Sequence, residues 1–443
     1  MNAVDMTQES MWKVIVKFSI PLMLGNICQQ LYLFIDALIV GRRLGVNGLA
    51  ALGSIEWYVF LVFGFIQGIT QGFSVCISQS SRMRQKELLR QSIYNALVLS
   101  LAIGFLLQVI CLNTLSSVLD IMRVPYAINV LAKSYLQILY ASIPIFFFNN
   151  MLLAILRALG NGALSFIAVL LSSFGNIFLD IFFLYILEYG IGGAAYGTVL
   201  AQFMSLIFCW SMIKRTGVKI SSKDKKIDKK ILINQLAVGL PIGLQNVITS
   251  VGGLAIQYVI NGFDILFIAG YIAANKIYIL LEIAASSYGY TILTYTAQNK
   301  GINKNRRILQ GFFSILSIGV ITAVMMSFIM IVFGQNILSF FSNTSKETLE
   351  ETIRYGYDYL IILAFFFPML YFLYICRSCL QGIGNTIIPM LSSVIQSVMR
   401  IFFAYLICPV IGYKGIFWGE VWAWIGADIF LGIAFIIQYK KIT

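Results

Sequence analysis

Long apolar runs constrain the fold of this 443-residue chain more than any other feature of its sequence. A helix needs roughly 20 residues to cross a hydrocarbon core about 30 Å thick, and twelve runs reach that length. We therefore predict an all-α integral membrane protein with twelve transmembrane helices. The predicted spans cover residues 14–40, 49–79, 92–117, 127–155, 163–187, 192–213, 232–260, 268–298, 308–338, 356–378, 386–410 and 415–438.

The scarcity of charge excludes a soluble fold. Charged residues make up 11% of the chain and apolar residues 59%, whereas a soluble domain carries roughly 25% charged residues. The net charge of +13 does not indicate a nucleic-acid partner, because the basic residues gather between apolar runs rather than on one wet face. The chain has no histidine, and we find no metal-ligand cluster or nucleophile–base arrangement. We expect neither an enzyme nor a cofactor.

The longest polar stretch sets the predicted orientation. Residues 214–230 hold eight basic and two acidic side chains, and loops rich in lysine and arginine stay in the cytoplasm. Alternation then places the other basic loops on the same side. We predict a multi-pass protein of the plasma membrane (the inner membrane of a cell with two), with both termini cytoplasmic.

The two halves of the chain repeat each other. Pro21 matches Pro241, Pro144 matches Pro368, and Gly160-Asn161 matches Gly384-Asn385, at nearly constant offsets. Six spans per half give both repeats the same orientation. The division is an N-terminal six-helix lobe over 1–213, a basic cytoplasmic linker over 214–231, and a C-terminal six-helix lobe over 232–443. Parallel repeats are typical of transporters that rock two lobes around a central cavity, although duplication alone also builds stable bundles.

Polar residues inside the spans of the first half indicate a coupling site. Asp36 lies in the first span, Asn176 and Asp180 share one face of the fifth, and Thr198 and Gln202 share one face of the sixth. Two carboxylates in lipid are costly, so they either share a proton or enclose a small cation such as Na⁺. The alternative is a hydrogen-bonded network that only positions helices.

The second half carries a different set of charges. They either stabilise the lobe as an ion-pair network or help to bind cations or substrate, and two further residues in the first half join the candidates. These second-lobe or cavity candidates are Lys276, Glu282, Arg400, Glu420, Asp428 and, in the first half, Glu56 and Gln202.

Several short motifs together resemble one transporter family. The chain is similar to the multidrug and toxic-compound extrusion (MATE) transporters, and most of all to their bacterial DinF-like branch. The motifs are Ile20-Pro21-Leu22, Gln29-Gln30-Leu31, Asp36, Leu156-Arg157-Ala158-Leu159-Gly160, Asn176-x-x-x-Asp180, Gly193-Ala194-Ala195-Tyr196-Gly197-Thr198, Gly239-Leu240-Pro241-Ile242-Gly243 and Gln381-Gly382-Ile383-Gly384-Asn385.

The resemblance implies an antiporter that exports cationic amphipathic drugs or toxic organic compounds in exchange for H⁺ or Na⁺. It implies that Asp36, Asn176, Asp180 and Thr198 form the cation site and that Pro21 bends the first helix. We expect small cationic substrates, membrane lipid as the surroundings, no metal beyond Na⁺, and a monomer.

A second reading is a flippase for lipid-linked polysaccharide precursors, which shares the two-lobe plan. A cavity for pyrophosphate-linked lipid needs positive charge, and Lys276, Arg400 and Arg157 are its candidates. Asp36 and Asp180 argue against this reading.

Overall fold

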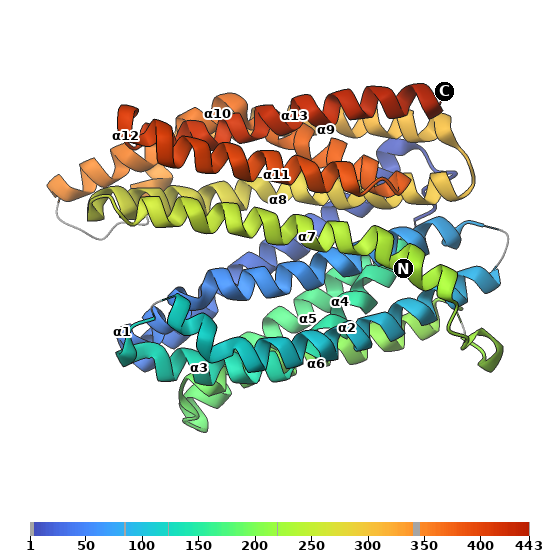
Figure 1. The fold of residues 1–443 in the computed structure, drawn as a ribbon, viewed down its shortest axis with the longest axis horizontal. Helices are drawn as coiled ribbons and strands as arrows, with labels where there is room; N and C mark the ends of the chain where they lie inside the picture. The colour runs from blue at the N-terminus through green and yellow to red at the C-terminus, as the bar shows by residue number, and fades with distance from the viewer. Residues whose placement is uncertain (1–3, 84–85, 123, 219, 340–345, 443) are drawn as a thin grey trace. The chain divides into compact units, whose positions relative to one another are not determined.

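The computed structural model describes residues 4–83, 86–122, 124–218, 220–339 and 346–442, and helices make up most of them (Figure 1). In chain order these are α1 (Met11–Ser81), α2 (Lys86–Ile121), α3 (Tyr126–Ala141), α4 (Ile143–Ala158), α5 (Gly162–Ile181), η1 (Phe182–Ile186), α6 (Gly190–Arg215), η2 (Ser222–Asp224), α7 (Lys229–Ile260), α8 (Ile265–Gly301), α9 (Asn305–Ser339), α10 (Lys346–Ile383), α11 (Ile387–Phe402), η3 (Phe403–Ile407), α12 (Cys408–Ile411) and α13 (Lys414–Ile442).

The described helices make twelve membrane crossings. Ten continuous helical stretches are long and apolar enough to cross a bilayer, and the pair α3–α4, bent by 54°, makes one more crossing. The stretch α1 counts twice, because its backbone leaves helical geometry at Gly45 (φ 69°, ψ −163°). The predicted all-α, twelve-span fold is confirmed.

The first two spans are joined more tightly than the sequence predicts. We expect a loop over residues 41–48, but α1 runs through this stretch and breaks only at Gly45. A positive φ strains any residue with a Cβ, and no atom lies within 4 Å of where the Cβ of Gly45 would be. The two spans are therefore connected by a break at one glycine, Gly45, in place of the expected loop.

The chain forms two compact units. The first contains Val16–Gly243 and the segment that ends at Glu9, and the second contains Ser10–Ile15 and everything from Leu244 onward. The boundary lies inside α7, later than the linker over 214–231, because the first half of α7 packs closely on α1. A Cβ on Gly68 would lie 2.6 Å from the carbonyl oxygen of Ile242. The predicted lobes follow the sequence repeat, whereas the compact units follow contacts between residues, so the two divisions differ. The predicted lobe boundaries stay a prediction.

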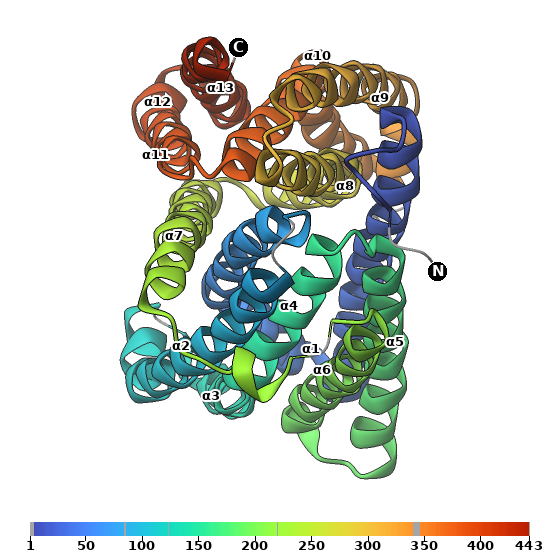
Figure 2. The same ribbon diagram turned by 90° about the vertical axis from the view of Figure 1, so that its right-hand side faces the viewer.

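Helix pairs position the polar residues within each unit. In the first unit α5 lies beside α6, and in the second α11 lies beside α13 while α10 packs on α8, α9 and α13 (Figures 1 and 2). On these helices, large side chains such as Phe367 on α10 and Phe417 and Trp424 on α13 are fully buried. The interhelical contacts between polar groups described below therefore form at depth rather than at loop ends.

The two halves share the same kinds of backbone irregularity. Gly160 (φ 87°) and Gly384 (φ 103°) both take left-handed geometry directly before a helix. Both following helices then widen into five-residue π-helical segments, η1 and η3. The parallel repeat predicted from matched residues is thus visible in matched backbone geometry.

The basic linker is held against α2. Ser221 donates from its backbone N–H and its hydroxyl to Asp224 Oδ2 (2.7 and 2.6 Å), and Arg90 Nε donates to the same oxygen (2.8 Å). These donors hold the pKa of the Asp224 carboxyl below its usual value. Asn95 Nδ2 also donates to the backbone oxygen of Lys226 (3.1 Å). The linker therefore docks through its one buried acid, while those of its lysines that the structure describes are exposed.

Candidate ion-coupling site

Three predicted residues meet where α5 packs on α6. Asn176 Nδ2 donates to Asp180 Oδ1 (3.3 Å) and to Thr198 Oγ1 (3.2 Å). The Thr198 hydroxyl in turn donates to the backbone oxygen of Ala194 (3.0 Å). Asn176 and Asp180 lie one turn apart on α5 and so share a face. The sequence pattern therefore corresponds to a direct contact between the fifth and sixth spans.

A glycine on α6 makes room for the Asp180 carboxylate. A Cβ on Gly197 would overlap Asp180 Oδ1 and would lie 3.2 Å from Asp180 N. Side chains at this position would push the carboxylate away, so the two helices can approach only because residue 197 has no side chain. Gly197 precedes Thr198 directly, and the two residues together set the geometry of the site.

Asp36 on α1 completes the site. Its carboxyl group interacts with that of Asp180, and both side chains are buried, with 8% and 0% exposed. Two buried acids that interact cannot both stay charged without cost, because like charges repel and burial disfavours the charged form. The arrangement therefore fits a shared proton or a bound cation better than two charged acids alone.

Three oxygen atoms at this site have no donor among the described residues. They are Asp36 Oδ1, Asp180 Oδ2 and Asn176 Oδ1, all buried. A buried polar atom without a partner is costly. Carboxylate and amide oxygens accept protons or bind small hard cations. The arrangement can therefore bind H⁺ or Na⁺, and the same acids attract both.

Tyr135 on α3 belongs to the site although sequence reasoning missed it. Its phenol interacts with Thr198 and with the Asp36 and Asp180 carboxyl groups. Tyr32, one turn before Asp36 on α1, interacts with both acids as well. No charge or spacing marks Tyr135 among the 23 tyrosines. The match of its helical face to α6 gives the signal, and it appears only in three dimensions.

Other predicted residues of the first half lie elsewhere. Gln202 points to α4, where its Oε1 accepts from Asn149 Nδ2 (2.6 Å). Glu56 is exposed, and the contacts recorded at the Asp36–Asp180 site do not include it. Pro21 lies within α1, but the break in that helix is at Gly45. The bend assigned to Pro21 stays a prediction.

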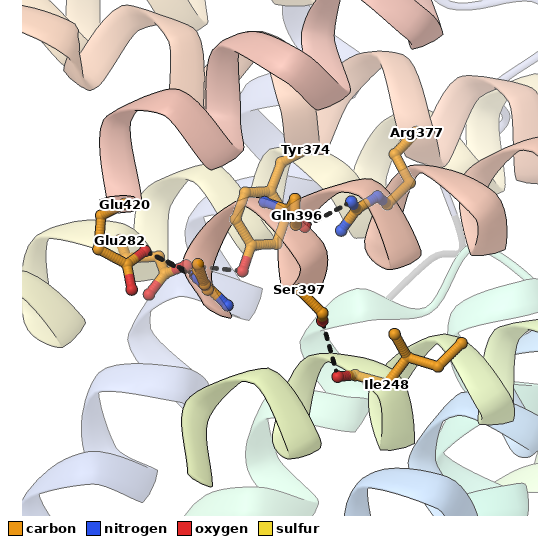
Figure 3. A network of polar contacts seen from close by, with 8 residues as sticks. Ile248, Glu282, Tyr374, Arg377, Gln396, Ser397 and Glu420 are labelled. Atoms are coloured by element: carbon orange, nitrogen blue, oxygen red, sulfur yellow. Dashed lines mark hydrogen bonds and ion pairs between the residues drawn. The ribbon is translucent and has the colours of Figure 1, made fainter. Parts of the chain in front are cut away.

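The second unit holds its charges in two networks. Arg400 donates through Nε (3.1 Å) and Nη2 (2.6 Å) to Glu420 Oε2, and the Tyr374 hydroxyl donates to Glu282 Oε1 (2.7 Å; Figure 3). Lys276 is exposed. The predicted pairing of bases with acids thus occurs for Arg400 and Glu420, which are among the least exposed charged side chains.

Two further residues of the second unit form the other network. Arg377 on α10 is buried and donates to Ser392 Oγ (2.9 Å) and to Gln396 Oε1 (2.8 Å; Figure 3). The predicted span ends at residue 378 and so places Arg377 at the membrane surface, whereas helix α10 continues to Ile383 and buries it. Asp428 lies at mid-length in α13, and no donor among the described residues reaches either carboxylate oxygen.

Comparison with known proteins identifies the family. The profile described as MatE matches residues 21–182 and 241–406, one segment in each repeat. The chain belongs to the MatE family. It is 29% identical to the probable multidrug resistance protein YpnP of Bacillus subtilis over 94% of this chain and 93% of YpnP. It is 25% identical to the multidrug export protein MepA of Staphylococcus haemolyticus over 78% of this chain and 76% of MepA.

The MatE fold is also shared with solved structures. A structure titled as the outward-facing conformation of a multidrug resistance MATE family transporter superposes with a TM-score of 0.92 at 24% identity, covering 100% of this chain and 99% of that one. This likeness shows the fold. The MatE profile match confirms the family that the sequence motifs resemble, while the DinF-like branch stays a prediction.

Proposed function

We propose that this MatE protein is a secondary antiporter that exports cationic amphipathic compounds in exchange for H⁺ or Na⁺. The observation that supports this most is the burial of two interacting carboxyl groups, Asp36 and Asp180, beside three buried oxygens that no donor among the described residues reaches. Such a pair changes its charge when one ion binds or leaves. That is the property a coupling site needs.

The proposed cycle uses the ion and the compound to favour different states. Binding of H⁺ or Na⁺ neutralises the acids and favours release of the cationic compound outside. Loss of the ion inside restores the negative charge and favours binding of the next compound. An ion can drive this cycle only through a difference in its affinity for the two states. Asn176 and Thr198 hold Asp180 in place throughout.

The orientation is part of the proposal. The loop over 214–230 and both termini lie in the cytoplasm, because basic loops stay inside. The buried acids then lie in the outer half of the first repeat. The names of YpnP and MepA support drug-like substrates, and the monomer stays an expectation.

Ethidium efflux from loaded cells or vesicles tests the proposal. Asp36→Asn and Asp180→Asn should each slow efflux at least about tenfold, equivalent to about 1.4 kcal/mol, because neither variant can bind and release the ion. Asp120→Asn is the matched control, since Asp120 is exposed in the last turn of α2. Wild-type efflux by either site variant would overturn the proposed role.

Imposed gradients separate the two coupling ions. Vesicles that hold the purified protein are loaded with ethidium, and an inward proton gradient is compared with an inward sodium gradient. Efflux driven by the proton gradient alone would assign H⁺, and efflux driven by sodium at constant pH would assign Na⁺. Efflux that responds to neither gradient would overturn antiport.

The flippase is weakened by the pairing of one of its cationic candidates. Arg400 forms an ion pair with Glu420, so its charge is already neutralised, whereas Arg157 Nη1 donates to the neutral Ser165 Oγ (3.5 Å). Scrambling of lipid-linked sugars without drug efflux would favour the flippase instead.

A further inference from the structure

Asp428 is the most exceptional acid of the second unit. It lies near the middle of α13, is 7% exposed, and its Oδ1 and Oδ2 are both buried without a hydrogen-bond donor among the described residues. A charged carboxylate in such a place costs several kcal/mol unless it is paired. Glu420 on the same helix avoids this cost by forming an ion pair with Arg400. Asp428 has no such ion pair among the described residues, so its burial must be stabilised in another way.

The base that interacts with Asp428 is Arg377, and its hydrogen-bond partners are neutral side chains. Arg377 on α10 interacts electrostatically with Asp428, but no N–O distance of 4.0 Å or less joins them among the described ion pairs. Its guanidinium donates instead to Ser392 Oγ and Gln396 Oε1 on α11. The acid and the base thus lie in one cluster without touching. Such an acid and base can stay apart or come together as an ion pair.

The groups around Asp428 favour a proton over a metal ion. From α10, Arg377 and the Cys376 thiol act on it. On α11 the charged group is Arg400, which is engaged by Glu420. No described charged group on α9, η3 or α12 interacts electrostatically with Asp428. A hard cation needs several oxygen ligands and is repelled by a nearby guanidinium. A single carboxyl group needs only one proton to become neutral.

We propose that Asp428 is a second proton-binding site of this protein, with Arg377 as its counter-charge. In the state described here Asp428 holds the proton as a neutral carboxylic acid, and Arg377 stays with Ser392 and Gln396. When the proton leaves, the carboxylate draws the guanidinium away from these partners and forms an ion pair. The site lies wholly within the second unit and shares no residue with the Asp36–Asp180 site.

Infrared difference spectroscopy on the purified full chain tests this directly. Spectra are compared between about pH 5 and about pH 8, where the carbonyl stretch of a protonated carboxyl group disappears as the proton leaves. Asp428→Asn should remove one such band, and Asp428→Glu should restore it. Arg377→Gln should keep the band at the alkaline end, because the ionised acid then has no counter-charge.

The control is an acid of the same unit that has partners. Asp358 accepts from the Tyr413 hydroxyl (3.0 Å) and lies 3.8 Å from Lys414 Nζ, so Asp358→Asn should leave the carboxyl bands unchanged. Thermal unfolding of each variant shows that it is folded before its spectrum is used. An Asp428→Asn spectrum identical to that of the wild type would overturn the proposal.

A sodium titration at fixed pH gives an independent check. Loss of the Asp428 band on addition of Na⁺ would assign a metal cation to the site and would also overturn the proposal. The measurement needs neither substrate nor gradient. Failure of the antiporter proposal in the efflux assays would therefore leave this result standing, and the reverse also holds.

Discussion

Gly197→Ala is the sharpest test of how the coupling site is built. The added methyl group would overlap Asp180 Oδ1 and would lie 3.3 Å from Asp180 Cγ. Ordinary contacts between carbon and its neighbours lie near 3.5–4.0 Å, so the carboxylate must move by about 1 Å. The bond from Asn176 to Asp180 is already 3.3 Å long and would be lost.

The expected effect separates stability from transport. Alanine gains about 1 kcal/mol of helix propensity over glycine, and overpacking costs about 1–3 kcal/mol, so the free energy of unfolding falls by at most about 2 kcal/mol. A hydrogen bond to a charged group is worth about 1.5 kcal/mol, which corresponds to about a tenfold loss of efflux. The variant should therefore fold and yet transport poorly.

Ethidium efflux at matched expression and thermal unfolding of purified protein measure the two effects. Gly175→Ala is the control, because its methyl group would meet only Met204 Sδ at 3.5 Å, and it should be as active as the wild type. Wild-type efflux by Gly197→Ala would show that the position of the Asp180 carboxylate does not matter for coupling. That result would refute the reasoning.

Three further predictions concern the rest of the molecule. Gly68→Ala should lower the melting temperature markedly, because its methyl group would lie 2.6 Å from backbone of α7; an unchanged value, equal to that of Gly53→Ala, would contradict this. Asp224→Asn should speed tryptic cleavage of the basic linker at neutral pH. Since the pKa of Asp224 is lowered on docking, acid should also release the linker, as cleavage by the acid protease pepsin would show: docking is complete above the usual carboxyl pKa of about 3.9 and is lost as pH falls through the lower folded value. Arg400→Met and Glu420→Met should each destabilise the fold by about 3–5 kcal/mol, and the double variant by far less; additive losses in thermal unfolding would refute the pairing.

The sequence predicts the membrane architecture well because that architecture depends on summed hydrophobicity. The twelve spans and the parallel repeat follow from patterns that extend over tens of residues. Single-residue geometry was harder to foresee. The expected loop over 41–48 is one left-handed glycine, Gly45, and the bend between α3 and α4 at residue 142 has no counterpart in hydropathy.

The candidate site was predictable only where charge marked it. Acids inside apolar runs are rare, so Asp36 and Asp180 stand out, and helical spacing brings Asn176 with them. Tyr135 looks like any apolar-run tyrosine until α3 is placed beside α6. Arg377 lay at the edge of a predicted span, and helix α10 extends past that edge to Ile383. Helix ends and interhelical contacts depend on packing, which no single stretch of sequence contains.

The paired π-helical segments η1 and η3 carry a historical consequence. Each holds one extra residue per turn, which is costly in an isolated helix and is kept mostly where function depends on it. One such segment follows the fifth span of each half, with the two offset by three residues from the match of Gly160 to Gly384, and a shared six-span ancestor is the simplest source of both. In the sequence match, Asp180 corresponds to Ala404, which lies within η3. The two halves therefore share an irregular backbone but not its acid, so the backbone pattern does not depend on the charge.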